Sequence, residues 1–351
     1  MYLNSTTIKK TDARKNNKVF PQNIISLLKY NLPIKMKLIY NYNYWLDEWL
    51  RNIKPTVKES TYIRYKNAVD NHIREELGEL NINKIDTEII KDYVNLKKTN
   101  GKKNEMGGLS SKTISELITI IRSSFRYAES FGIYSSCCFD QILIKKENRE
   151  IRVLSKNEEK RLLYILNKNT DEYKLGVLIC LFTGIRIGEL CALKWENINL
   201  EEKTIKIVST MQRLQTKEHN SRKTHIVITD PKSYSSNRTI PLPNCLLKYL
   251  LQFKSSYSSF LLTGNDNTFV EPRTMQNRFK KYLREANIDN ANFHALRHTF
   301  ATRCIESGFD AKVLSEILGH SSVNLTLDKY VHSSMEHKRS NMQKLNMTIV
   351  I

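Results

Sequence analysis

Apolar positions recur at helical spacing through the first half of the chain. In "YWLDEWLRNI" the side chains of Trp45, Trp49 and Ile53 fall at i, i+4 and i+8, which places them on one face of a helix. Three later stretches show the same spacing, and each opens on residues that favour a helix start. The candidate starts are Ser60, Asp86 or Thr87, and Ser110 or Ser111. The pattern predicts four helices before residue 147.

The second half of the chain has apolar residues at helical spacing near its beginning and its end. Between these two parts the spacing of the apolar residues changes. Ser155 and Glu158 have the spacing of a capping box, and Gly184 stands where an apolar helix should end. "KTIKIVSTM", "THIVITD" and "NRTIPLP" then alternate with a period of two. After Pro243 the helical spacing returns. We therefore expect a mainly α protein with a small antiparallel β-sheet, an α+β fold.

A polar, charged stretch, "IKKENREIRVLS", separates the two halves and reads as a linker. It divides the chain into a helical domain over residues 37–147 and a second domain over residues 148–335. Residues 336–351 form a C-terminal tail with several apolar side chains. Residues 1–36 are a basic extension, and three interpretations stay open for them: a basic arm that adds phosphate contacts, a tail, or translated sequence ahead of a true start at Met36.

The charge balance limits the class of partner. The chain has 56 Lys and Arg against 36 Asp and Glu, a formal net charge of +20. Such an excess favours a polyanionic partner, nucleic acid before membrane. No window approaches the roughly 18 to 20 apolar residues of a membrane span, and the N-terminus lacks an apolar signal core. We expect a cytoplasmic protein without membrane contact.

The six cysteines show no CxxC spacing. Cys180, Cys191 and Cys304 fall within apolar helical patterns, so we expect them to be reduced and buried. His294 and His298 have the i, i+4 spacing of a zinc helix, but Ala295 stands where HExxH has its Glu. The sequence therefore predicts no metal site and no cofactor, and it gives His298 a packing or buttressing role within its helix.

Several polar residues are spaced as a phosphate would require. A phosphodiester carries negative charge that grows in the transition state, and guanidinium groups match its geometry. Cleavage also needs a nucleophile in line and a proton donor for the leaving oxygen. His294 and Arg297 lie three apart, which puts them on one side of a helix. The candidates for the complete set are Arg186, Lys232, His294, Arg297, His320 and Tyr330.

Three strings carry a resemblance to a known family. They are "TGIRIGELCALKWENIN", "HALRHTFATRCIESGFDAKVLSEILGH" and "LDKYVH". Together they resemble the tyrosine recombinase (phage integrase) family, whose order of Arg, Lys, His-x-x-Arg, His and Tyr they follow. The resemblance covers residues 38–335, with a helical core-binding domain ahead of the catalytic one.

The resemblance implies a role for each candidate. Arg186 and Arg297 would clamp the scissile phosphate, and Tyr330 would attack it to leave a 3′-phosphotyrosyl link. His294 and His320 would hydrogen-bond the phosphate, and His294 would also take the tyrosine proton. Glu189 resembles a supporting acidic position.

The proton donor for the leaving oxygen is less sharply defined. Lys232, in "PKSYSSNRTIPL", resembles the family's hairpin lysine, and Lys223 is the alternative. The stretch between residues 210 and 234 is longer than in the simplest family members.

The resemblance also implies a function and its partners. We expect a site-specific recombinase that acts on double-stranded DNA attachment sites as a homotetramer. It would integrate or excise a mobile element without metal or ATP, together with accessory DNA-bending or directionality factors, and its tail would dock on a neighbouring protomer. Three alternatives stay open: a chromosome-dimer-resolving recombinase, a type IB topoisomerase, and a DNA-binding regulator that has lost catalysis.

Overall fold

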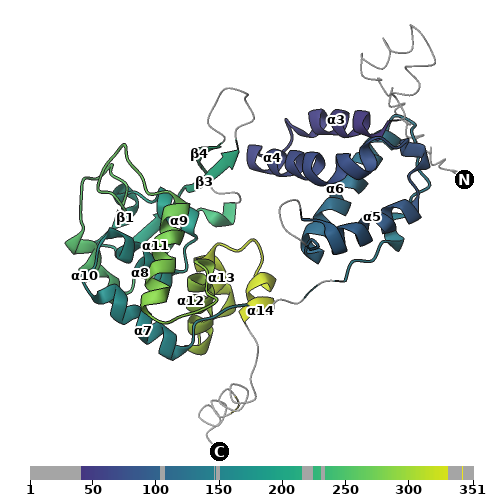
Figure 1. Ribbon diagram of the computed structural model, residues 1–351. Coiled ribbons are helices and arrows are strands. Elements are labelled where there is room, and N and C mark those ends of the chain that lie inside the picture. The colour runs from purple at the N-terminus through teal and green to yellow at the C-terminus, as the bar shows by residue number, and fades with distance from the viewer. Residues whose placement is uncertain are drawn as a thin grey trace, which may run out of the picture. The chain divides into compact units, whose positions relative to one another are not determined.

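The computed structural model divides the chain into two compact units, residues 1–148 and 149–351 (Figure 1). We call them the N-terminal unit and the C-terminal unit. The residues that the structure describes are 41–102, 107–145, 147, 151–215, 224–230, 234–330 and 342. The predicted extension and nearly all of the predicted tail lie outside them, as does part of the predicted linker.

The regular elements in the described part of the N-terminal unit are helices. Its elements are α3 (Tyr42–Ile53), α4 (Glu59–Ala68), the π-helix η1 (Val69–Gly78), the 3-10 helix η2 (Ile82–Lys84), α5 (Thr87–Asn100), α6 (Ser111–Glu129) and the 3-10 helix η3 (Phe139–Gln141). The core forms where the apolar stripes meet. Trp45 and Trp49 are almost fully buried, and the Tyr42 hydroxyl reaches Ser124 on α6 at 2.7 Å.

The predicted helix starts are confirmed at two of three positions. Asp86 and Ser110 are N-caps, and the side chain of each accepts a bond from a backbone N–H three residues on. The prediction of a start at Ser60 is wrong, because α4 begins at Glu59 with Lys58 as its N-cap and no side-chain cap bond. A cap contributes only about 1 kcal/mol, which packing of the helix can override.

The C-terminal unit surrounds two small sheets with helices. Its helices are α7 (Lys156–Asn167), α8 (Glu172–Thr183), α9 (Ile187–Ala192), η4 (Trp195–Asn197), η5 (Tyr234–Ser236), α10 (Asn244–Gln252), α11 (Pro272–Glu285), α12 (His294–Glu306), α13 (Ala311–Leu318) and α14 (Asn324–Tyr330). Its strands are β1 (Ile198–Asn199), β2 (Thr204–Ile207), β3 (Thr210–Gln215), β4 (Thr224–Thr229) and β5 (Arg238–Pro241). The predicted capping box of Ser155 and Glu158 is confirmed at the start of α7.

The predicted α+β class is confirmed, but the strands form two antiparallel sheets instead of one. One sheet has the order β1-β2-β5, and β3 pairs only with β4 in the other. The chain leaves the first sheet after Ile207, and β3 then passes close to α9. A Cβ on Gly188 of α9 would lie 2.6 Å from the Met211 carbonyl oxygen. This close approach, which alternation alone does not encode, separates β3 and β4 from the first sheet.

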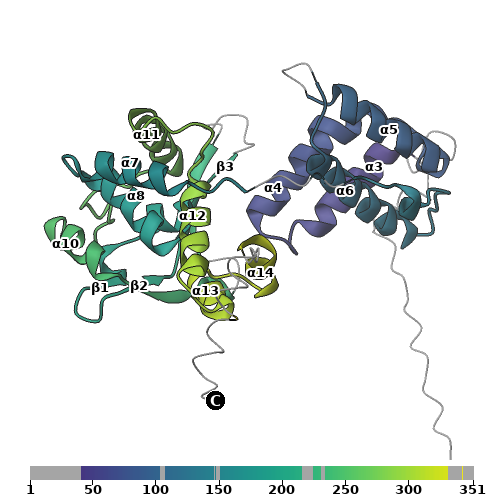
Figure 2. The ribbon, with the colours of Figure 1, turned by 90° about the horizontal axis from the view of Figure 1, so that it is seen from below.

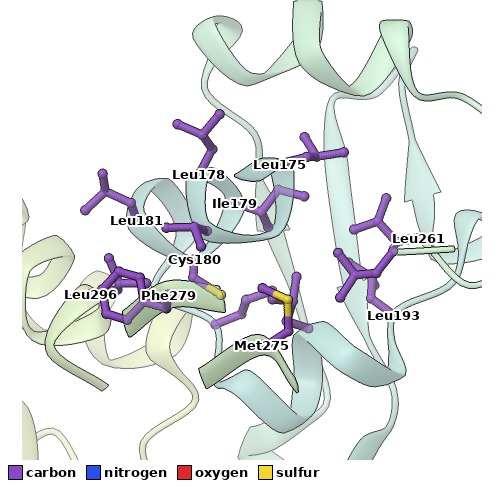
Figure 3. Close-up of a cluster of buried hydrophobic side chains, with 14 of the residues drawn as sticks. Leu175, Leu178, Ile179, Cys180, Leu181, Leu193, Leu261, Met275, Phe279 and Leu296 are labelled. Atoms are coloured by element: carbon purple, nitrogen blue, oxygen red, sulfur yellow. The ribbon is translucent and has the colours of Figure 1, made fainter. Parts of the chain in front are cut away.

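Helix α8 is the centre of the C-terminal core. It is apolar around its whole circumference, which is typical of a helix buried on all sides. Figure 3 shows Leu178 and Cys180 of α8 among side chains from neighbouring elements, including Phe279 of α11 and Leu296 of α12. All six cysteines are free, and the predicted burial of Cys180, Cys191 and Cys304 is confirmed.

Gly184 ends α8 in the left-handed conformation, with φ of 66°. The position is also crowded. A Cβ there would lie 2.5 Å from the Phe300 ring and 2.8 Å from the Leu318 side chain. Gly184 therefore serves both the turn and the close packing of α8 on α12 and α13.

We expect Gly184→Ala to destabilise the C-terminal unit by roughly 2–5 kcal/mol, from left-handed strain together with overpacking. The measurement is urea unfolding of the full chain. Gly308→Ala is the matched control, because Gly308 has φ of 84° and nothing within 4 Å of its Cβ position. The control isolates the strain, about 1 kcal/mol, and equal losses in the two variants would contradict the packing argument.

Candidate active site

Five of the six predicted site residues gather in the C-terminal unit around the ends of four helices. Arg186 is the N-cap of α9, His294 and Arg297 lie on α12, His320 follows α13, and Tyr330 is the last residue of α14. Helices α12, α13 and α14 lie next to one another (Figure 2). A small apolar cluster that includes Tyr330 packs between them. A cavity of about 540 Å³ opens here. Its lining includes Arg186, His294 and His320.

Arg297 is held by the ends of two helices. Its side chain is buried, with 3% of the residue exposed. One terminal nitrogen donates to the Gly184 carbonyl at 2.9 Å, and the other donates to the Leu318 carbonyl at 2.8 Å. Carbonyls at helix C-termini carry partial negative charge that favours a cation. Burial, and then the nearby Arg186, lower the pKa of Arg297 to about 9, so the group is charged at neutral pH.

Arg186 is positioned by Glu189, one turn later on α9. Its Nη1 donates to the Glu189 carboxylate at 2.7 Å, and its backbone N–H donates to the other carboxylate oxygen at 2.9 Å. Its Nη2 donates to the Gly319 carbonyl, at the end of α13, at 3.2 Å. The predicted supporting residue Glu189 therefore contacts Arg186 directly.

Arg238 is a site residue that the sequence reasoning missed. It is the first residue of β5, and its buried side chain donates to both carboxylate oxygens of Glu189, at 2.9 and 3.3 Å. It also donates to the carbonyls of Ser236 and Ile317. The sequence signal was the alternation of side chains along the strand. Arg238 is two residues before the buried Ile240, so both side chains lie on the inward face of β5. An arginine at an inward position of a strand requires a buried partner.

Glu189 is the carboxylate that Arg186 and Arg238 share. Burial alone would raise the pKa of its carboxyl, but the bond from Arg238 and the charges of both arginines lower that pKa below its ordinary value. Glu189 is the only acidic residue among the described residues that line the cavity. With the nearby Arg297 included, three guanidinium charges stand against one carboxylate charge, so two positive charges stay unneutralised.

The arginines differ in how much hydrogen-bonding capacity they have left. A guanidinium group carries five N–H groups. Arg238 commits four of them to Glu189 and to two backbone carbonyls. Arg186 and Arg297 commit two each. Counting only partners within the described residues, each of these two keeps three donors for an anion, whereas Arg238 is almost saturated and has a positioning role.

The Tyr330 ring is buried beside the arginines, with 7% of the residue exposed. Burial raises the pKa of its hydroxyl, and the charges of Arg297 and then Arg186 oppose that rise. The hydroxyl lies 2.7 Å from Nδ1 of His298. The ring also lies parallel to that of His320, with the centroids 6.5 Å apart.

The two predicted phosphate-binding histidines, His294 and His320, both line the cavity. His320 follows Gly319, a left-handed C-cap with φ of 65°, and its Nδ1 lies 2.8 Å from the buried hydroxyl of Thr326. Burial, and then Arg297 and Arg186, lower the pKa of His320 to about 3. His294 is exposed at the cavity, and its ring meets the His298 ring edge-on at 4.5 Å.

The structure changes the interpretation of His298. The sequence gives it a packing role and makes His294 the residue that takes the tyrosine proton. In the structure the contact with the Tyr330 hydroxyl belongs to His298. The signal was present in the spacing, since His298 follows Arg297 directly and lies one turn after His294 on the same helix.

Lys232 lies outside the described residues, and so does the alternative, Lys223. Ser236, four residues after Lys232, lines the cavity.

In the described part of the chain, no group of three or more His, Cys, Asp or Glu side chains is arranged to hold a metal ion. Nor is any described helix long and apolar enough to cross a membrane.

Comparison with known proteins places this site in a family. The model of the phage integrase family matches residues 152–337, more than half of the chain. The model of the phage integrase N-terminal SAM-like domain matches residues 41–97.

Curated relatives match over most of the chain. A XerC-like tyrosine recombinase of Caldanaerobacter subterraneus is 28% identical over 86% of this chain and 81% of its own length. The integrase of Staphylococcus phage L54a is 25% identical over 87% of this chain and 92% of its own length.

A solved structure shares the fold. The Tn1549 transposon integrase, determined in complex with a circular intermediate DNA, superimposes with a TM-score of 0.71 over 87% of this chain and 99% of its own, at 22% identity. The family match and the two curated relatives confirm the predicted resemblance: the chain belongs to the phage integrase family of tyrosine recombinases.

Proposed function

We propose that this protein cuts and rejoins double-stranded DNA at specific sites through a covalent 3′-phosphotyrosyl intermediate formed on Tyr330. One observation carries the proposal. A buried tyrosine, Tyr330, lies close to two arginines, Arg186 and Arg297, that keep unused donors beside a cavity lined by Arg186, His294 and His320. A phosphodiester has the charge and the acceptor oxygens that this cavity lacks.

In this mechanism the arginines bind the scissile phosphate and stabilise the charge that grows on its oxygens. Arg186 and Arg297 are already fixed by carbonyl and carboxylate oxygens. Donors that are preorganised in this way need no rearrangement when the charge develops, which is the source of most electrostatic catalysis. His294 and His320, at the cavity, would donate further hydrogen bonds to the same phosphate.

The leaving 5′-oxygen needs a proton, and we assign its donor to Lys232, with Lys223 as the alternative. Ser236 lines the cavity, and four residues of extended chain span at most about 14 Å. The chain length therefore permits a lysine at position 232 to act here. The energy of the broken phosphodiester bond is kept in the phosphotyrosyl bond. A hydroxyl from another strand can therefore reverse the reaction without ATP.

Comparison with solved integrases supports the proposed partners. A lambda integrase tetramer bound to a Holliday junction shares this fold, with a TM-score of 0.62 at 17% identity. We propose that this chain likewise acts as a tetramer on paired attachment sites, with accessory factors that bend DNA or set the direction. Integration or excision of a mobile element is the favoured role, because a phage integrase and the transposase of transposon Tn916 from Enterococcus faecalis are both relatives.

One alternative role has a specific observation behind it. The XerC-like relative covers nearly the whole chain, and a recombinase that resolves chromosome dimers would use the same site. A type IB topoisomerase would relax supercoils as a monomer, which a relaxation assay separates from strand exchange. A regulator without catalysis would bind DNA but form no covalent adduct.

We expect Tyr330→Phe to abolish the covalent adduct, because it removes the attacking oxygen and leaves the ring in place. The assay uses nicked duplexes that trap cleaved product, selected from a pool with a randomised core by covalent capture on the wild-type protein. Tyr257→Phe is the matched control, since Tyr257 is an exposed tyrosine of the same unit. An adduct formed by Tyr330→Phe at the wild-type rate would reject Tyr330 as the nucleophile.

Glu189→Gln should lower the stability of the C-terminal unit at pH 7 by about 3–5 kcal/mol, because Arg238 and Arg186 lose their shared buried charge. The pKa of Glu189 is lower in the folded protein than its ordinary value of 4.5. Its contribution is therefore present above about pH 4.5 and is lost as the pH falls through the folded pKa.

Urea unfolding of both proteins between pH 7 and pH 3 measures this. The difference between wild type and Glu189→Gln should shrink on acidification. Glu285→Gln is the control, since Glu285 forms an exposed pair with Lys281 at 3.8 Å, worth at most about 1 kcal/mol. A difference that stays constant with pH would contradict the linkage.

Affinity for duplex DNA should fall steeply with salt, since the net charge of +20 favours phosphate contacts. A log–log plot of the binding constant against salt concentration should be linear, with a slope of about −0.9 per phosphate neutralised. Fluorescence anisotropy with a labelled duplex measures it. A slope near zero would be incompatible with phosphate-dominated binding.

A further inference from the structure

The Tyr330 ring is held from two sides by histidines. His298 contacts the hydroxyl edge, with Nδ1 2.7 Å from the oxygen. His320 covers a face, with the two rings 3° from parallel. The His320 ring is itself fixed by the hydroxyl of Thr326, a fully buried residue of α14. These contacts orient the phenol with its oxygen toward His298.

We propose that His298 is the general base that accepts the phenolic proton of Tyr330 during attack on the scissile phosphate. This inference rests on the proposed function and adds a catalytic residue to it. His298 contacts the reacting oxygen itself, at a distance that suits direct proton transfer. The transfer requires the tautomer of His298 that carries its proton on Nε2, so that Nδ1 accepts from the hydroxyl.

The other bases near Tyr330 are less suited to this step. Nδ1 of His320 is engaged with Thr326, and its ring lies parallel to the phenol at 6.5 Å. Glu189 binds two arginines. His294 meets His298 edge-on. Among the hydrogen bonds of the described residues, the bond to the Tyr330 hydroxyl is made by His298.

Burial and the charges around His298 keep its imidazole unprotonated and able to accept a proton. The groups that face it are His294 and Arg297 on its own helix, and Lys329 and Tyr330 on α14. Burial, and then His294, Lys329 and Arg297, lower the pKa of His298 to about 4. Its imidazole is neutral at pH 7.

A bound phosphate changes the balance at the moment of reaction. Its negative charge offsets the positive field of the arginines, which makes the imidazole a better base than in the free protein. Bond formation to phosphorus also removes the basicity of the tyrosine oxygen. Proton transfer is therefore expected to accompany the attack and not to precede it.

The step balances without any further reactant. The O–H bond of Tyr330 breaks, and its proton passes to Nδ1 of His298. The bond between the tyrosine oxygen and phosphorus forms as the bond from phosphorus to the 5′-oxygen breaks. That oxygen takes a proton from the acid assigned to Lys232. In the rejoining step the His298 imidazolium returns its proton to the tyrosine oxygen.

Two substitutions of His298 distinguish its two possible roles, which are to hold the Tyr330 hydroxyl in place and to accept its proton. Asn in place of His298 puts an amide near the position of Nδ1, which can hydrogen-bond the hydroxyl but cannot take its proton. Ala at the same position removes both roles. His225→Asn is the matched control, because His225 lies exposed on β4.

The experiment measures the rate constant of covalent adduct formation on the captured nicked duplex at saturating protein. We expect His298→Asn and His298→Ala both to be slower by about 10²-fold or more, the size of a general-base contribution. DNA binding and the His225→Asn rate should stay within about twofold of wild type. Adduct formation by His298→Asn within about threefold of wild type would overturn the proposal, since it would show that holding the hydroxyl suffices.

A substrate with a sulfur at the bridging 5′ position identifies which proton transfer is lost. Its thiolate leaves without protonation, so it restores cleavage only to variants that lack the acid. The His298→Asn defect should persist on this substrate. Recovery of the wild-type rate would place His298 on the leaving-group side and overturn its role as base.

A second measurement keeps His298 in place, and so does not depend on the stability of the His298 variants. In protein labelled with ¹⁵N-histidine, Tyr330→Phe should shift the Nδ1 resonance of one histidine, and an unchanged spectrum would overturn the contact.

Failure of the proposed function would look different from failure of this inference. The proposed function is wrong if no duplex from the pool forms an adduct with wild-type protein. Normal wild-type adduct formation with an unaffected His298→Asn variant would reject the inference alone.

Discussion

Three neighbouring guanidinium groups with a single buried carboxylate among them are the constraint on which the rest of the site depends. Arg186 and Arg238 share Glu189, while Arg297 relies on backbone carbonyls. Burial, and then the charge of the nearby Arg186, lower the pKa of Arg297 to about 9. The arrangement is stable only while each group keeps its fixed oxygen partners, and it leaves two charges for an anion to neutralise.

The oxygen partners come from the way two helices end. Gly184 and Gly319 adopt the left-handed conformation at the ends of α8 and α13, where carbonyls lack intrahelical partners. Arg297 and Arg186 occupy those carbonyls. The same atoms therefore complete the helix ends and orient the arginines, so the stability of the core and the precision of the site cannot be varied independently.

Most of the helical framework, and the residue types of the site, could be predicted from the sequence. Period and capping residues located the helices because both act within a few residues of chain. The exceptions are informative. The start of α4 is not at Ser60, and β3 and β4 form a sheet of their own because β3 packs closely on Gly188. Contacts of this kind are set by distant parts of the chain, which local patterns do not encode.

The sequence by itself determined the chemistry, because motif order fixes which side chains are present and on which elements they lie. It did not determine which atoms meet. Arg238 looked like a strand residue until its contact with Glu189 was known. His298 looked like a packing residue until α14 brought Tyr330 to its Nδ1, across 32 positions of sequence. Only the tertiary structure decided these pairings, since the packing of α12 against α13 and α14 sets distances that no spacing along the chain fixes.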